Sequence, residues 1–120
     1  MEQGFVKVAS ATPRIRVADP VYNAQVICEQ AKEAAEHGAK IVVFPELCIT
    51  GYTCNDLFLQ ELLLEKAKEA LLTIAEETGQ LETLFLVGLP VDKDGRLYNV
   101  AAVLYRGRIL GMIPKKNIPM

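Results

Sequence analysis

The stretch from Ile41 to Phe58, IVVFPELCITGYTCNDLF, constrains the fold more than any other part of the sequence. It opens with four apolar residues, all of them β-branched or aromatic. Such a run predicts a strand that is buried on both faces, as in a parallel sheet covered by helices. Pro45 cannot donate to a ladder, so we expect the strand to end there. Glu46 is then the first charge beyond a buried strand, at the sheet edge where ligands and catalytic groups gather.

The residues before this stretch predict a strand followed by a helix. Alternating residues indicate a strand over Gly4–Ala11, and Asp19-Pro20 is a strong helix start, because Asp caps free N–H groups and Pro loses no bond at the first helical position. Apolar residues then recur at three- and four-residue steps to about His37, and Gly38 provides a left-handed cap. The segment is therefore a β-α-β unit, which should be right-handed with parallel strands.

The residues after it predict a mixed sheet. Asn55 or Asp56 caps a second helix, and three further strands follow, the first of them ended by Pro90. The expected elements are a helix over Leu57–Thr78 and strands over Leu84–Leu89, Leu97–Tyr105 and Arg108–Pro114. Short turns at Asp92–Gly95 and Arg106-Gly107 separate the last strands, which is typical of antiparallel hairpins. The fold class is therefore α/β, with a sheet that is parallel in its first half and antiparallel in its second.

Two helices cannot cover both faces of about five strands, so we expect one sheet face to stay bare and apolar. The sequence ends soon after the last strand, as IPKKNIPM, with no closing helix. A self-sufficient domain would avoid such a face, and we therefore expect this chain to be the front part of a longer protein.

Bulk composition excludes several classes of function. The chain has 120 residues, 51% of them hydrophobic, which suits one globular domain. Its net charge is −2 with interspersed acids and bases, so we expect no nucleic-acid partner. No apolar run reaches the roughly 20 residues that cross a bilayer, and no secretion signal opens the chain. Three cysteines cannot all pair with one another, and reduced thiols in the cytoplasm are the expectation.

Two charged residues, each just past a proline, are candidates for catalysis. Glu46 could act as a general base at a strand end, because partial burial would raise the pKa of its carboxyl. The alternative is a solvated glutamate that simply follows a strand. Lys115 comes after the last strand and Pro114, and its ammonium could stabilise an oxyanion. The alternative is that Lys115 and Lys116 form a solvated basic pair.

The cysteines and the histidine suggest no other site. Cys48 and Cys54 are close to Glu46 in sequence, but the only histidine, His37, is at a helix end, where the helix dipole accounts for it. Cys28 is on the apolar face of the first helix, which indicates a core position. The cysteine spacing is not that of a metal site, and no glycine-rich phosphate loop occurs. We therefore expect no bound metal or cofactor in this stretch.

The stretch FPELCITGYTCNDLF resembles the nitrilase, or carbon–nitrogen hydrolase, superfamily. Within it, the stretch is most similar to the N-terminal glutaminase domains of glutamine-dependent NAD synthetases. Three features carry the resemblance: the glutamate after proline in VVFPEL, the GYT that is followed by Cys54 and Asp56-Leu57-Phe58, and the terminal IPKKNIP, which is similar to the lysine segment of the family.

The resemblance implies an α-β-β-α sandwich with a Glu–Lys–Cys triad at the strand ends. Carried over by position, Glu46 is the general base, Lys115 stabilises the tetrahedral intermediate, and Tyr52 lies by the substrate pocket. The nucleophilic cysteine of the family lies beyond the lysine on a later strand, so none of the three cysteines here matches it. Residues 1–120 would then be the N-terminal part of a glutaminase domain, without its nucleophile and without the synthetase domain that follows.

The function implied by the resemblance is hydrolysis of L-glutamine to supply ammonia for ATP-dependent conversion of deamido-NAD to NAD. ATP and Mg²⁺ would bind the absent synthetase domain, and the full-length enzyme would be a cytoplasmic homo-oligomer, whereas this stretch alone would be inactive. Two alternatives remain. One is a stand-alone amidase of the same superfamily acting on another small amide, and the other is a non-catalytic interaction module with a nitrilase-like fold.

Overall fold

A computed structural model describes residues 7–16, 18–45, 48–50 and 57–118 of the chain. Within these residues the chain forms one five-stranded sheet and two helices. In chain order the elements are β1 (Val8–Ser10), α1 (Pro20–Glu36), β2 (Ile41–Val43), α2 (Leu57–Glu77), β3 (Leu84–Lys93), β4 (Arg96–Tyr105) and β5 (Arg108–Ile118). The strands are ordered β1-β2-β3-β4-β5; the β1–β2 and β2–β3 pairs are parallel, and the β3–β4 and β4–β5 pairs are antiparallel. The mixed sheet expected from the sequence is thus confirmed.

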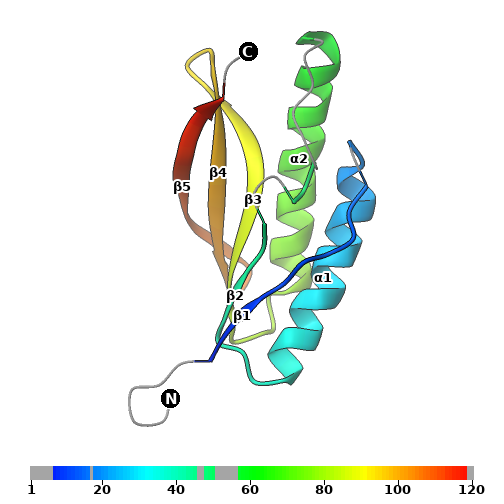
Figure 1. Cartoon of the computed structure of the whole chain (residues 1–120), viewed down its shortest axis with the longest axis vertical. Helices are drawn as coiled ribbons and strands as arrows, with labels where there is room; N and C mark the ends of the chain where they lie inside the picture. Colours follow the sequence, from blue (N-terminus) through cyan, green and yellow to red (C-terminus); the bar gives the residue numbers. More distant parts are fainter. Residues whose placement is uncertain (1–6, 17, 46–47, 51–56, 119–120) are drawn as a thin grey trace.

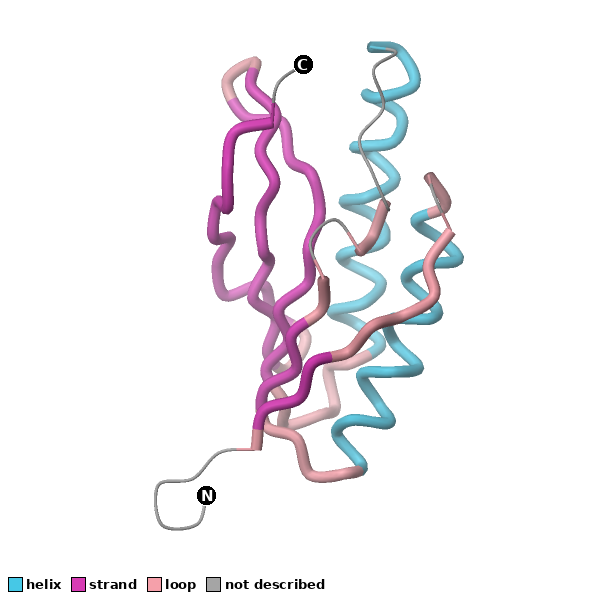
Figure 2. Tube along the Cα trace, in the orientation of Figure 1, coloured by secondary structure: helices cyan, strands magenta, loops and turns pink. Residues whose placement is uncertain are grey.

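Both helices lie on the same side of the sheet (Figures 1 and 2). This follows from the topology, because each parallel connection is expected to be right-handed and both connections step across the sheet in the same direction. α1 begins where the sequence predicts: Asp19 Oδ1 accepts a hydrogen bond from the Tyr22 amide at 3.1 Å, and Pro20 occupies the first turn. α1 ends at Glu36, two residues before Gly38, whose φ of +84° only glycine adopts readily.

The core lies between the helices and the sheet. Side chains that alternate along the strands face the helices, and α1 and α2 contribute the opposite half. The fully buried members with the largest side chains are Ile27, Val42, Leu71, Ile74, Phe85, Val87, Leu89 and Leu104. Strand register supports one continuous layer, since Phe85 pairs with Leu104 and Val42 with Phe85. Neither helix, over the residues described, is long and apolar enough to cross a membrane.

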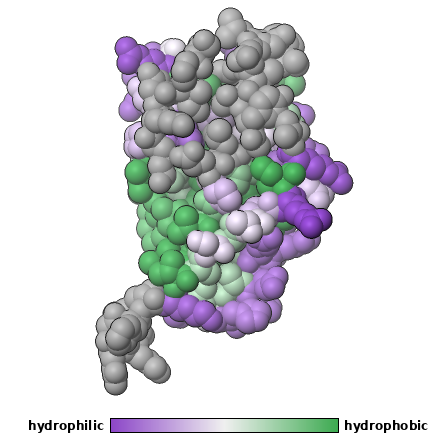
Figure 3. All heavy atoms as spheres, in the orientation of Figure 1, coloured by the Kyte–Doolittle hydropathy of each residue, from purple (hydrophilic) through white to green (hydrophobic). Residues whose placement is uncertain are grey.

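The opposite face of the sheet, called here the open face, has no helix over it. Val42 is fully buried, but its neighbour Val43, which points the other way, is 39% exposed. The strand was predicted to be buried on both faces, and that prediction is wrong because both helices pack on one side. Exposed apolar residues of the same orientation continue across the sheet at Val8 and Ile113. In Figure 3 hydrophobic side chains gather over the strands, whereas hydrophilic ones cover the helix side.

Two prolines do not end their strands as predicted. β3 continues through Pro90, which pairs with Asn99, and β5 continues through Pro114, which pairs with Val100. The alternation of the ladder explains this, because an N–H at position 90 would point toward the side of β2, which has already ended, and one at position 114 would point away from β4. Neither proline removes a ladder hydrogen bond, so both are tolerated.

Candidate functional site

Of the three predicted site residues, only Lys115 is among the residues that the structure describes. Glu46 and Tyr52 lie outside the described residues. Lys115 was expected to follow the last strand, and that expectation is wrong: it lies inside β5, where its backbone is described. Their catalytic roles stay predictions, and the geometry that bears on them comes from the residues that flank them.

The residues on either side of Glu46 are fixed to β3. The Phe44 amide donates to the Leu86 carbonyl at 2.9 Å, and the Ile49 amide donates to the Gly88 carbonyl at 3.2 Å. Both carbonyls are on the side of β3 that pairs with β2. The chain is therefore hydrogen-bonded to β3 both before and after Glu46. Phe44, Cys48 and Ile49 are buried in the core. The segment that carries the predicted base therefore starts and ends on rigid structure at the carboxyl end of β2.

Asn23 on α1 holds the far side of this segment. Its side chain is fully buried; Nδ2 donates to the carbonyls of Ile49 at 2.8 Å and Arg16 at 2.7 Å, and Oδ1 accepts from the Arg16 amide at 2.6 Å. One carboxamide thereby joins α1, the loop before it and the segment after Glu46. Sequence reasoning missed this residue, because an asparagine within an amphipathic helix carries no signal of the loops that it will meet.

A β-bulge in β5 surrounds Lys115. Val100 of β4 pairs with Pro114, but the next residue of β4, Asn99, pairs with Lys116, so Lys115 is the extra residue. Bulges redirect the local chain and occur often beside active sites. Because β4 is antiparallel to both of its neighbours, β5 runs parallel to β2 and β3. Lys115, late in β5, and the segment after β2 are consequently at the same edge of the sheet.

The side chain of Asn99, opposite this bulge, is the least expected feature of the edge. It is 1% exposed, and neither its Nδ2 nor its Oδ1 has a hydrogen-bond partner among the residues described. Thr50, which follows Ile49, also has a buried hydroxyl without a partner there. Buried polar groups are normally paired, so two exceptions at one sheet edge call for a physical reason.

The described cysteines are not activated nucleophiles. Cys48 is 1% exposed, and burial raises the pKa of its thiol to about 11, although its Sγ lies 3.6 Å from the Gly88 carbonyl oxygen. Burial raises the pKa of the Cys28 thiol to about 11 as well, with a smaller contribution from Glu77. A thiol that reacts at neutral pH has a lowered pKa instead. No cluster of residues that could hold a metal ion occurs within the described part of the chain.

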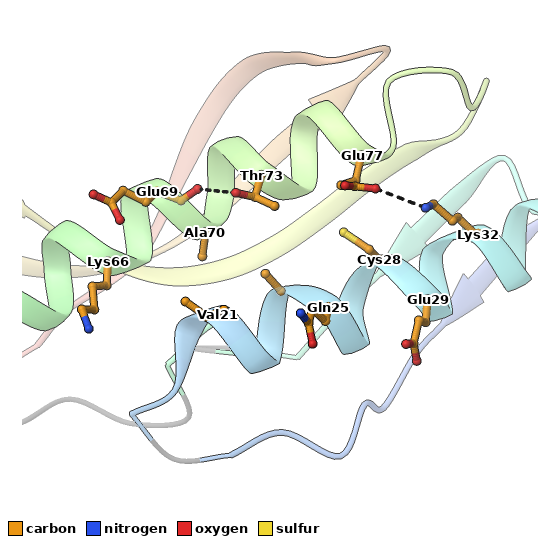
Figure 4. A pocket seen from close by; sticks show the side chains of 11 residues that line it. Val21, Gln25, Cys28, Glu29, Lys32, Lys66, Glu69, Ala70, Thr73 and Glu77 are labelled. Carbon is orange, nitrogen blue, oxygen red and sulfur yellow. Dashed lines mark hydrogen bonds and ion pairs between the residues drawn. The ribbon is translucent and has the colours of Figure 1, made fainter.

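A groove of about 400 Å³ runs between α1 and α2, and Cys28 faces it (Figure 4). All of its lining residues come from the two helices. An exposed ion pair closes one end, with Lys32 Nζ 3.3 Å from Glu77 Oε2. The groove is on the helix layer, away from the sheet edge that carries the Lys115 bulge. Its one cysteine, Cys28, has a raised thiol pKa and is therefore not an activated nucleophile.

Comparison with known proteins identifies the family of this chain. Residues 7–119 match the carbon–nitrogen hydrolase family. The chain is 38% identical over 118 residues to a glutamine-dependent NAD(+) synthetase of Mycobacterium tuberculosis, covering 98% of this chain and 17% of that protein. It is 33% identical over 119 residues to the synthetase of the same name from Acinetobacter baylyi, covering 99% of this chain and 21% of that protein.

Solved structures share the fold. A glutamine-dependent NAD(+) synthetase from Cytophaga hutchinsonii superposes with a TM-score of 0.83 at 30% identity, over 95% of this chain and 19% of that one. An amidase from Nesterenkonia superposes with a TM-score of 0.75 at 24% identity, over 96% of this chain and 44% of that one. The chain thus spans about a fifth of the length of the synthetases that it matches, and its fold is nitrilase-like. The chain belongs to the carbon–nitrogen hydrolase family.

Proposed function

We propose that this chain forms part of a glutaminase site that hydrolyses the side-chain amide of L-glutamine and supplies ammonia for ATP-dependent synthesis of NAD. The observation that carries the proposal is the similarity, at 33–38% identity over nearly the whole chain, to proteins named glutamine-dependent NAD(+) synthetases. The sheet geometry is compatible with it, because the segment after β2 and the Lys115 bulge are at one edge. ATP and Mg²⁺ are assigned to a synthetase domain outside these residues.

In the proposed reaction Glu46 accepts the proton of a cysteine thiol that belongs to the complete protein but lies outside residues 1–120. The thiolate attacks the amide carbon of glutamine, and Lys115 stabilises the oxyanion that forms. The C–N bond then breaks, and the departing nitrogen takes the proton held by Glu46 and leaves as ammonia. Water, deprotonated by Glu46, attacks the glutamyl thioester and releases glutamate and the thiol. Tyr52 is assigned to the wall of the substrate pocket.

The test is Glu46→Gln in the complete protein, measured with glutamine and with free ammonia as nitrogen sources. Loss of a general base should lower the glutamine-dependent rate roughly 10²- to 10⁴-fold. The ammonia-dependent rate should stay within about twofold, since that reaction needs no amide hydrolysis. Glu82→Gln is the matched control: Glu82 is an exposed glutamate whose carboxylate lies 3.7 Å from Arg106, and both rates should be unchanged.

Three results would contradict the proposal. If both rates fall together in Glu46→Gln, then Glu46 supports the structure and not the hydrolysis. Amide hydrolysis without any ammonia-dependent NAD synthesis would assign the complete protein to the amidases instead. Absence of both amide hydrolysis and ammonia-dependent NAD synthesis would leave a non-catalytic module with this fold.

The same assay separates the two adjacent lysines. Lys115→Met should abolish the glutamine-dependent rate as Glu46→Gln does, because the oxyanion loses its cation. Lys116→Met is the control, since Lys116 holds the regular register position opposite Asn99. An effect confined to Lys116→Met would reassign the lysine.

A further inference from the structure

Asn99 occupies the centre of the edge where the glutaminase site is proposed. It is on β4, between Pro90 of β3 and Lys116 of β5. β3 holds the segment that carries Glu46 through the carbonyls of Leu86 and Gly88, and β5 carries Lys115. The strand of Asn99 therefore separates the two strands that position the predicted catalytic groups.

The side chain of Asn99 is buried on the open face, yet it is not used to hold the described fold together. Both of its polar atoms lack a partner among the described residues, and the side chain is only 1% exposed. Asn23 provides the contrast, because its carboxamide is equally buried and makes three hydrogen bonds to backbone. An unpaired buried amide opposes folding, so a chain that keeps one gains something other than stability from it.

The bulge gives the second, independent observation. The extra residue in β5 is Lys115, and the ladder resumes at the Asn99–Lys116 pair. The irregularity and the unpaired amide thus occur at the same step of the β4–β5 ladder. A bulge at that step locally disrupts the pairing of β5 beside Asn99.

We propose that Asn99 is a substrate-binding residue whose carboxamide hydrogen-bonds glutamine in the site. An asparagine side chain offers two N–H donors and a carbonyl acceptor, and a primary amide offers the same set, so the two groups can pair reciprocally. This inference rests on the proposed function, and it adds a residue that neither the sequence pattern nor the family resemblance singled out.

The test is Asn99→Leu in the complete protein. The substitution has nearly the same shape but no polar atoms, so the second-order rate constant kcat/KM for glutamine should fall at least roughly tenfold, mainly through a higher KM. The ammonia-dependent rate should stay within about twofold. The melting temperature should be equal or higher, because the unpaired buried group is gone. Activity and stability are thus expected to move in opposite directions, which loss of a structural contact does not produce.

Two further variants keep the test decisive. Asn99→Ser shortens the side chain but keeps a small polar group, so it covers the case in which Asn99→Leu fails to fold, and it should show the same rise in KM. Tyr98→Phe is the matched control, since Tyr98 precedes Asn99 on the same strand but packs toward the helix side of the sheet. It should leave the KM for glutamine unchanged.

The outcomes separate cleanly. An unchanged kcat/KM for glutamine in both Asn99 variants would overturn the inference. Equal losses of both activities together with a lower melting temperature would also overturn it, and would make Asn99 structural. Either result leaves the proposed function standing, provided that Glu46→Gln abolishes the glutamine-dependent rate alone. A wild-type protein without glutamine-dependent activity would instead remove the proposed function, and this inference with it.

Discussion

The two sides of the sheet differ in how completely their side chains are satisfied. On the helix side, apolar residues are buried against α1 and α2, and two buried polar side chains there are paired: Asn23 makes three hydrogen bonds, and Thr78 Oγ1 donates to the Ile74 carbonyl at 2.7 Å. On the open face Val8, Val43 and Ile113 are exposed, and Asn99 is buried without a partner among the described residues. Packing on the helix side thus stabilises the fold, whereas the open face has exposed apolar surface and an amide without a partner among the described residues.

The largest expected difference in stability is between variants of two adjacent residues of β3. Phe85 is 1% exposed on the helix side, whereas Leu86 is half-buried on the open face. Phe85→Ala should lower the free energy of unfolding by about 3–5 kcal/mol, because it leaves a cavity in a packed core. Leu86→Ala should cost less than about 1.5 kcal/mol, because less of its surface is buried. Urea denaturation of both variants measures the contrast, and equal losses would mean that the two faces are packed alike.

The next expected effect concerns the paired asparagine. Asn23→Ala removes three hydrogen bonds and leaves the buried Ile49 carbonyl and the part-buried amide and carbonyl of Arg16 without this partner, so it should destabilise the protein by about 2–4 kcal/mol. Asn99→Leu should cost nothing by comparison. Thermal unfolding of the two variants side by side gives the answer. A destabilisation by Asn99→Leu as large as that of Asn23→Ala would remove the distinction between the two faces.

The smallest expected effect concerns the pH dependence of stability. Burial raises the pKa of the Cys48 thiol from 9.0 to about 11, so the folded state favours the neutral thiol. The resulting stabilisation is complete below pH 9 and is lost as the pH rises toward 11, because the unfolded chain ionises first. The loss should be about 2–3 kcal/mol, and Cys48→Ala should lack it. Identical alkaline denaturation of wild type and variant would show that Cys48 is not buried on the helix side of the sheet.

Local signals explain why much of the fold could be predicted from the sequence. Asp19-Pro20 and Gly38 fix both ends of α1 through caps that depend only on nearby residues, and turns at Asp94-Gly95 and Arg106-Gly107 define the hairpins. The mistakes came from non-local geometry. Whether Pro90 or Pro114 ends a strand depends on which neighbour its missing N–H would have faced, and no residue beside the proline reports that.

The candidate site was predictable only in part for a similar reason. Glu46 and Lys115 could be chosen because each follows a proline and matches a family motif, but their roles rest on residues outside the described structure or on a backbone position alone. Asn99 could not be chosen. An asparagine in a strand has no distinctive neighbours in sequence, and its proposed role rests on burial beside a bulge without a partner among the described residues.

The proposed function depends most on an acid and a cation meeting at one edge of the sheet. The most direct measurement is the distance between the Glu46 carboxylate and the Lys115 ammonium in an experimental structure of the complete protein with glutamine bound. We predict a separation below about 6 Å, where each charge stabilises the other, with Asn99 in contact with the substrate. Side chains on opposite faces of the sheet, with glutamine bound elsewhere, would contradict the account.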